Sequence, residues 1–93
     1  MRHMSSDDKL RQLRGAIDKA DISLVTLLAL RTELVKEIGA HKHKHGMAVR
    51  DEKRRNEVLA SRIAHGKKLG LSEELVRILF EKILDSAEKV EGK

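Results

Sequence analysis

Two basic residues occupy positions where an amphipathic helix should carry apolar side chains. In the segment LLALRTELVKEIGAHK, residues 27–42, Arg31 stands in the apolar seam between Leu27 and Leu34. Lys42 follows eleven residues later, close to three helical turns, so the two cations share one face about 16 Å apart. A buried guanidinium without an anionic partner is costly. This face must therefore meet an anion.

The anion that meets Arg31 has two candidate sources. One is an Asp or Glu side chain that closes a buried salt bridge, which the pattern at Arg31 alone favours. The other is a bound ligand. Lys42 supports this source, because it adds a second cation to the face while Glu33 and Glu37 point elsewhere on the helix. Two cations on one inward face, with no carboxylate between them, suggest a pocket for a small anion.

Further charged residues are candidates for this pocket. On the same helix, Arg14 lies about 25 Å from Arg31 and about 100° round the axis, so only an antiparallel partner chain can deliver it. Asp51 and Arg54 stand at the start of a second predicted helix, whose free N–H groups also favour anions. The pocket is thus predicted to draw on more than one helix.

Glu91, near the end of the printed sequence, is the last candidate. It follows Phe80 by eleven residues and Ala87 by four, so it lies on their helix face. The pattern alone favours a solvated residue in a fraying C-terminus. The alternative is a carboxyl group inside the pocket.

The cluster HKHKH, residues 41–45, invites a metal-binding interpretation because His41 and His45 are four residues apart. No third ligand follows at a recognisable spacing, and lysines flank the pair. We expect no metal and no other cofactor, and interpret the cluster as the solvated basic end of a helix. Contact with phosphate or RNA is a weaker alternative, because no aromatic residue lies nearby to stack a base.

Helices must position these residues. Apolar or small residues recur at steps of three and four, the spacing of a packed helical seam, at Leu10, Leu13, Ile17, Ala20, Leu24, Leu27, Leu34 and Ile38. This helix is predicted over residues 7–45, with Gly46 as its stop signal. Asp51 is the predicted N-cap of a second helix over residues 52–68, and Ser72 that of a third. No segment alternates with period two, so the fold class is all-α, with one long helix and two shorter ones.

The long helix is too long for a compact chain of this size. A continuous helix over residues 7–45 would be about 58 Å long, whereas a compact chain of 93 residues has a diameter of roughly 30 Å. Either the helix kinks within a monomeric bundle or a second chain covers its apolar seam. No proline or other break signal interrupts the pattern, so we predict an intertwined helical homodimer.

Composition limits the remaining possibilities. The length suits one domain, over residues 5–93, and the absence of Cys excludes a disulfide framework. The first twenty residues are charged throughout, unlike a signal peptide, and the longest apolar run, residues 27–30, is too short to span a membrane. We expect a cytoplasmic protein. Residues 1–4, MRHM, are either native or a cloning remnant before a natural start at Met4.

The net charge is +5, with a pI near 9.7, which favours anionic partners. The charges are mixed along the chain and not gathered in blocks. This distribution argues against a disordered basic tail.

Over about residues 9–91 the chain resembles an enzyme family. The pattern LRGAID…LLALRTELVKEIGAHK…G…VRDEKR…LF…E is similar to that of the all-helical (AroQ-type) chorismate mutases, and the relative spacings agree without a gap. The resemblance implies an intertwined dimer of three-helix chains. It also implies rearrangement of chorismate, a small dianion, to prephenate on the route to phenylalanine and tyrosine.

The resemblance implies a substrate-binding set of Arg14, Arg31, Lys42, Asp51, Arg54 and Glu91, with Arg31, Lys42 and Glu91 catalytic. Arg31 would bind the side-chain carboxylate of chorismate, helped by Arg14 of the other subunit. Lys42 would bind the ether oxygen and a carboxylate. Arg54 would support the ring carboxylate, and the backbone N–H of Asp51 would contact the region of the ring hydroxyl.

The chain departs from the family pattern at three positions. Arg55 stands where Glu is usual, which weakens the expected contact to the ring hydroxyl. Ala87 stands where Ser is frequent, with Ser86 one residue early. Glu91 stands where Gln is usual, although some members carry Glu. As a hydrogen-bond donor to the ether oxygen Glu91 must be protonated, so activity is predicted to fall as pH rises.

Two other interpretations of the sequence stay open. Isochorismate-pyruvate lyases and aminochorismate-type mutases share the scaffold, and the lyases also lack the Glu that Arg55 replaces. A non-catalytic helical dimer that binds protein or nucleic acid belongs to another class. A nucleic-acid binder would display its cations outside, whereas these point into the apolar seam. We therefore expect chorismate as the ligand, and neither nucleic acid nor membrane as a partner.

Overall fold

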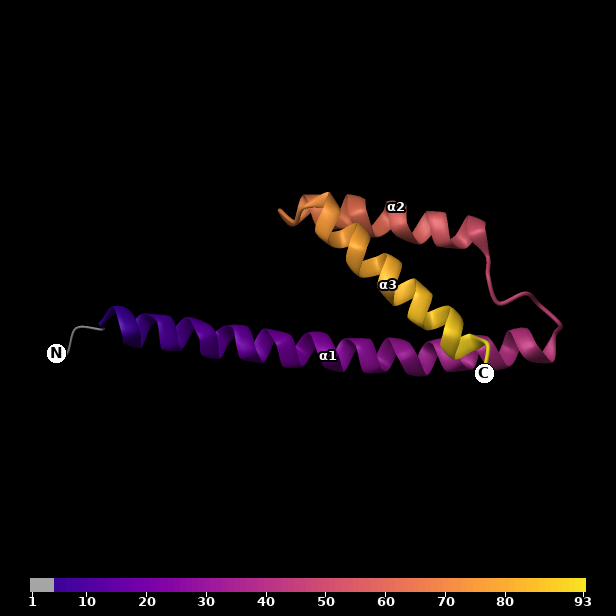
Figure 1. Cartoon of the computed structure of the whole chain (residues 1–93), viewed down its shortest axis with the longest axis horizontal. Helices are drawn as coiled ribbons and strands as arrows, with labels where there is room; N and C mark the ends of the chain where they lie inside the picture. Colours follow the sequence, from indigo (N-terminus) through magenta and orange to yellow (C-terminus); the bar gives the residue numbers. More distant parts are fainter. Residues whose placement is uncertain (1–4) are drawn as a thin grey trace. The chain divides into compact units, whose positions relative to one another are not determined.

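The computed structural model describes residues 5–93 and consists of helices and their connections. Helix α1 runs over Ser6–Lys44, α2 over Glu52–Lys68 and α3 over Glu73–Glu91 (Figure 1). No strand occurs in this described range, so the predicted all-α class with one long and two shorter helices is confirmed. The alternative origins of residues 1–4 concern a segment outside it. None of the helices described has the length and apolar content that crossing a membrane requires.

Local signals set the ends of α1. At its start the Ser5 hydroxyl accepts a hydrogen bond from the Asp8 N–H at 3.1 Å, and the Asp8 carboxylate accepts one from the Ser5 N–H at 3.4 Å. At its end Gly46 has a φ of 63°, and the Met47 N–H donates to the Lys42 carbonyl at 2.8 Å. This is the pattern of a glycine C-cap. The predicted range differs from the observed helix by one residue at each end.

The predicted caps of the shorter helices are also confirmed. The Asp51 carboxylate accepts a hydrogen bond from the Arg54 N–H at 3.0 Å, and the Ser72 hydroxyl accepts one from the Leu75 N–H at 3.1 Å. Gly70, with a φ of 83°, allows the chain to turn between α2 and α3.

The chain divides into two compact units, Met1–Arg31 and Thr32–Lys93. Over its described residues, 5–31, the first unit consists of the first part of α1 and its N-terminal cap. Large apolar side chains of this unit are exposed, namely Leu10, Leu13, Ile17, Ile22, Leu24, Val25, Leu27 and Leu30. The predicted seam of this segment is therefore uncovered in the single chain.

The second unit holds the buried apolar side chains of the described chain, which are Val35, Val58, Ile63 and Val76. Helices α2 and α3 run antiparallel within it (Figure 1). A Cβ atom at Gly66 of α2 would lie 2.6 Å from Cγ2 of Val76 in α3. Gly66 thus permits the close approach of the two helices.

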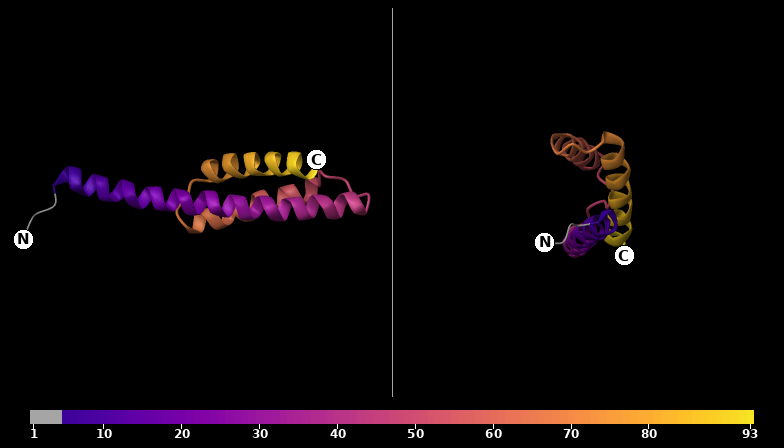
Figure 2. Two further views of the ribbon diagram at one scale, coloured as in Figure 1. Left: turned by 90° about the horizontal axis from the view of Figure 1, so that it is seen from below. Right: turned by 90° about the vertical axis from the view of Figure 1, so that its left-hand side faces the viewer.

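The last turn of α3 lies against residues 32–44 of α1 in the same unit (Figures 1 and 2). The buried residues of this part of α1 are Val35 and Gly39, whereas the predicted seam residues Leu34 and Ile38 are half exposed. The face of α1 that packs within the chain is therefore a neighbour of the predicted seam and distinct from it.

Candidate functional site

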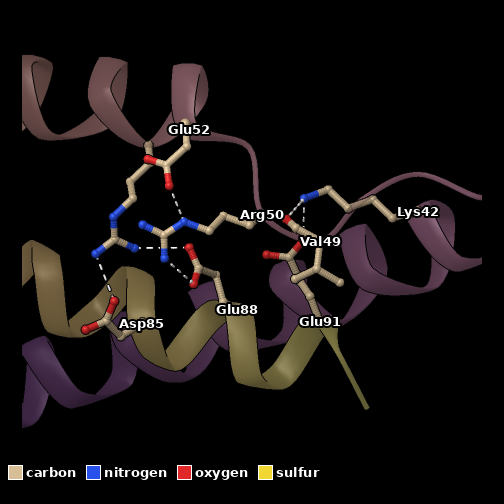
Figure 3. Close-up of polar contacts among 8 residues, drawn as sticks. Lys42, Val49, Arg50, Glu52, Asp85, Glu88 and Glu91 are labelled. Carbon is tan, nitrogen blue, oxygen red and sulfur yellow. Dashed lines mark hydrogen bonds and ion pairs between the residues drawn. The ribbon is translucent and has the colours of Figure 1, made fainter.

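Lys42 of α1 and Glu91 of α3 meet in the second unit (Figure 3). The Lys42 Nζ atom lies 2.6 Å from the Glu91 Oε1 atom and donates a hydrogen bond to the Val49 carbonyl at 2.7 Å. The Lys42 side chain is 18% exposed and the Glu91 side chain 10%. Sequence periodicity alone favoured a solvated Glu91, but this carboxylate is largely buried and lies beside a cation.

The contact between Lys42 and Glu91 is an ion pair by distance and not a well-directed hydrogen bond. The Oε1 atom of Glu91 is buried and accepts no hydrogen bond of good geometry from the described residues. An ammonium group has three N–H donors. After the bond to Val49, Lys42 retains donors that a ligand oxygen can use.

A close backbone contact brings Glu91 to Lys42. Gly39 lies three residues before Lys42, on the same side of α1. A Cβ atom at Gly39 would lie 2.8 Å from the Glu91 Cα atom and 3.1 Å from the Glu91 carbonyl oxygen. Glycine is therefore required for α3 to end where its last carboxyl group reaches the Lys42 ammonium.

A network of ion pairs joins the start of α2 to the end of α3. The Arg55 guanidinium lies 2.8 Å from Asp85 through Nη2 and 3.1 Å from Glu88 through Nη1. Arg50 lies 3.3 Å from the other Glu88 oxygen and also pairs with Glu52. The hydrogen bond to Glu52, and then the negative charges of Glu52 and Glu88, raise the pKa of Arg50 above its usual value. Arg55 thus points at carboxylates of α3.

Two other predicted site residues, Asp51 and Arg54, belong to the second unit and make contacts of their own. The Asp51 carboxylate caps α2, and the Arg54 side chain is 63% exposed, 3.9 Å from Glu57. Arg31 is partly buried in the first unit, and Arg14 is exposed there. Within the second unit the structure brings together Lys42 and Glu91 from the predicted set.

A shallow groove lies beside Arg14. Its lining residues are Asp7, Leu10, Arg11, Arg14, Gly15 and Asp18. All of them belong to α1, so this groove is an open surface of one helix.

The histidine cluster does not form a larger ligand set in the described residues. The rings of His41 and His45 lie 4.4 Å apart between centroids. No group of three or more His, Cys, Asp or Glu side chains within residues 5–93 is arranged to hold a metal ion.

Sequence reasoning did not single out Gly39, which contacts the Glu91 backbone, or Glu88, which pairs with Arg50 and Arg55. A signal for Gly39 was present, because a glycine inside a helical pattern often marks a close approach. Glu88 offered no such signal, since its partners Arg50 and Arg55 lie more than thirty residues earlier in the chain.

The model of the family described as chorismate mutase type II matches residues 13–92. The chain therefore belongs to this family, and the family resemblance noted in the sequence is confirmed.

Similar proteins include a T-protein of Haemophilus influenzae, 33% identical over 81 residues, which are 87% of this chain. A bifunctional chorismate mutase/prephenate dehydratase of Buchnera aphidicola is 33% identical over 84 residues, or 90% of the chain. A T-protein of Enterobacter agglomerans is 34% identical over 76 residues, or 82% of the chain. The matched segments cover 20 to 22% of these relatives, so the chain spans about a fifth of their length.

Proposed function

We propose that this chain is a chorismate mutase, an isomerase that rearranges chorismate to prephenate in the biosynthesis of phenylalanine and tyrosine. The observation that carries the proposal is the part-buried ammonium of Lys42 beside the buried carboxyl group of Glu91. Membership of the chorismate mutase type II family supports the same activity. The name of the Buchnera aphidicola relative, bifunctional chorismate mutase/prephenate dehydratase, includes this activity as well.

The rearrangement breaks a C–O bond and forms a C–C bond in one concerted step, so it requires no nucleophile and no general base. Negative charge gathers on the ether oxygen as the C–O bond breaks. Lys42 keeps N–H groups beyond the one that binds Val49, and one of them can donate to this oxygen. By analogy with oxyanion-hole donors, such a contact contributes about 2.7–4 kcal/mol to the barrier reduction.

Glu91 supplies the second donor to the ether oxygen in this proposal. An ionised carboxylate has no hydrogen to give, so only protonated Glu91 can act. Its buried Oε1 atom accepts no well-directed hydrogen bond from the described residues. Substrate binding would replace the contact between Lys42 and Glu91 by two contacts to the ether oxygen.

Arginine side chains bind the two carboxylates of chorismate in the proposed complex. Arg31 binds the side-chain carboxylate together with Arg14 of a second subunit, and Arg54 supports the ring carboxylate. The Asp51 backbone N–H, at the start of α2, faces the ring hydroxyl region. Holding one folded conformer of the substrate in this way accounts for up to roughly 7–11 kcal/mol in ideal cases.

We infer that the active form is an intertwined homodimer. The exposed apolar residues of the first unit support this inference, since Ile17 is 57% and Leu27 62% exposed in the single chain. An uncovered apolar stripe of this kind marks an interaction surface. A second copy laid antiparallel would cover the stripe and carry Arg14 to the site of its partner.

The test of the activity uses the purified chain, incubated with chorismate and, separately, with isochorismate. Isochorismate is included because the Arg55 guanidinium is engaged with Asp85 and Glu88, and position 55 offers no carboxylate for a ring hydroxyl. Prephenate from chorismate is expected. Release of pyruvate from isochorismate would assign the lyase reaction instead. Turnover of neither compound would contradict both and favour a non-catalytic helical dimer.

A further inference from the structure

Arg55 is engaged by α3 on two sides. Its side chain is 13% exposed and lies 2.8 Å from Asp85 and 3.1 Å from Glu88. Arginine presents a planar fork of donors, and ion pairs of this kind with two carboxylates are directional as well as strong. The first turn of α2 is thus tied to the last two turns of α3.

Glu88 is the carboxylate that the network shares. Arg55 contacts its Oε1 atom at 3.1 Å, and Arg50 contacts its Oε2 atom at 3.3 Å. Figure 3 shows the Glu88 side chain directed towards Arg50, while Glu91 is directed towards Lys42. Both oxygens of Glu88 are therefore held by cations, Arg50 in the connection just before α2 and Arg55 in the first turn of α2.

Glu91 lies three residues after Glu88, on neighbouring positions of the same helix face. It is the last residue of α3, and helix ends fray unless other contacts hold them. The backbone contact of Gly39 with Glu91 limits how close α3 comes to α1. The ion pairs of Glu88 with Arg50 and Arg55 limit how far the last turn of α3 can move away.

We propose that Arg55 is a positioning residue, which acts through Glu88 to keep the carboxyl group of Glu91 beside Lys42. The inference rests on the proposed function for its effect on catalysis. It gives position 55 a role without contact to the substrate. In this role Arg55 maintains the geometry of the site and takes no part in the chemical step.

The test is a double-mutant cycle with Arg55→Ala, Glu91→Ala and the combined variant. Arg55→Ala should lower kcat by roughly tenfold to a hundredfold, the scale expected of a misplaced catalytic group. It should change KM by no more than about threefold, because the carboxylates of the substrate keep their arginines. In the Glu91→Ala background the same substitution should lower kcat no further.

Two further variants make the cycle specific. Arg55→Lys retains the charge but not the fork, so it should recover part of the lost kcat. Arg77→Ala is the matched control, because Arg77 is an exposed arginine of α3 that pairs with Glu73 of the same helix at 3.1 Å. It removes an ion pair of similar length and should leave kcat unchanged. If Arg55→Ala does not fold, Glu88→Gln replaces it in the cycle with the same expected result.

Additive losses in the cycle would overturn the inference, because Arg55 would then act independently of Glu91. A rise in KM at constant kcat would also overturn it, since that result indicates direct binding of substrate by Arg55. Hydrogen exchange gives a readout that does not depend on activity. Arg55→Ala should speed exchange of the Val90 and Glu91 amides, and unchanged exchange would overturn the inference. Wild-type protein without mutase activity, but with faster exchange in the variant, would contradict only the proposed function.

Discussion

The ammonium of Lys42 lies 2.6 Å from the carboxylate of Glu91, although the two residues are 49 positions apart and belong to different helices. Both side chains are largely withdrawn from solvent, at 18% and 10% exposure. A cation and an acid placed together in this way can both face one oxygen atom of a ligand.

Glu91→Gln should remove the pH dependence of turnover that Glu91 causes. In the wild-type protein kcat should fall as pH rises, because the ionised carboxylate has no hydrogen to donate to the ether oxygen. The amide of Gln donates at every pH, so the profile of the variant should be flatter. The measurement is kcat against pH for both proteins, and identical profiles would remove Glu91 from the reaction.

Arg31→Ala should lower kcat/KM by roughly a hundredfold or more, because charge-assisted hydrogen bonds to a carboxylate are lost. Circular dichroism and sedimentation should still report a folded protein of unchanged oligomeric state. Arg31→Lys, which keeps the charge, should show a smaller decrease in kcat/KM than Arg31→Ala. Near-normal turnover by Arg31→Ala would contradict the assignment of the whole site.

Mixing two inactive variants should restore activity if Arg14 acts across a dimer interface. Arg14→Ala and Lys42→Ala chains, unfolded and refolded together in equal amounts, form mixed dimers that contain one intact site each. Random pairing in a closed twofold dimer should therefore recover about a quarter of the wild-type turnover. If the mixture stays as inactive as its components, Arg14 does not complement Lys42 across subunits.

Gly39→Ala should disrupt the site, because its Cβ atom would lie 2.8 Å from the Glu91 Cα atom. We expect a loss of about 1–3 kcal/mol in the free energy of unfolding, as in other overpacked positions, together with reduced kcat. Gly15→Ala is the matched control, since nothing lies within 4 Å of its added Cβ atom. There alanine should stabilise the helix by up to about 1 kcal/mol. Urea denaturation measures the free energy of unfolding of both variants. An equal change in the two would contradict the close contact at Gly39.

Glu73 should make stability depend on pH in the acidic range. Hydrogen bonds from Lys67 and Arg77, and the charges of both, lower the pKa of Glu73 below its ordinary value of 4.5. The folded state then binds the proton less readily than the unfolded state, so the stabilisation is present above 4.5 and is lost as pH falls through the lower folded pKa.

The measurement is urea denaturation at a series of pH values for the wild-type protein and Glu73→Gln. Their small difference in stability should shrink as pH falls. Glu74→Gln, which removes a neighbouring charge, is the comparison. A difference between wild type and Glu73→Gln that grows towards acid would contradict the sign of this prediction.

Local signals determined the helices. The hydroxyl of Ser72 and the carboxylate of Asp51 cap helices at the predicted residues because a cap needs only the backbone N–H groups of the next turn. The continuity of α1 over Ser6–Lys44 likewise follows from its unbroken three-and-four spacing, without proline. The family was likewise predictable from the sequence pattern alone.

Contacts between distant segments decided the rest, because hydrophobic periodicity carries no information on which charged residues meet. The sequence pattern did not decide whether Glu91 is a solvated residue at a helix end or a carboxyl group inside the pocket. Its position against Lys42 depends on how α3 packs on α1 at Gly39. The role of Arg55 depends in the same way on Asp85 and Glu88, thirty and thirty-three residues further along the chain. Only the folded chain shows that Arg55 is directed to Glu88 of α3, whereas Glu91, one turn later, is directed to Lys42 of α1.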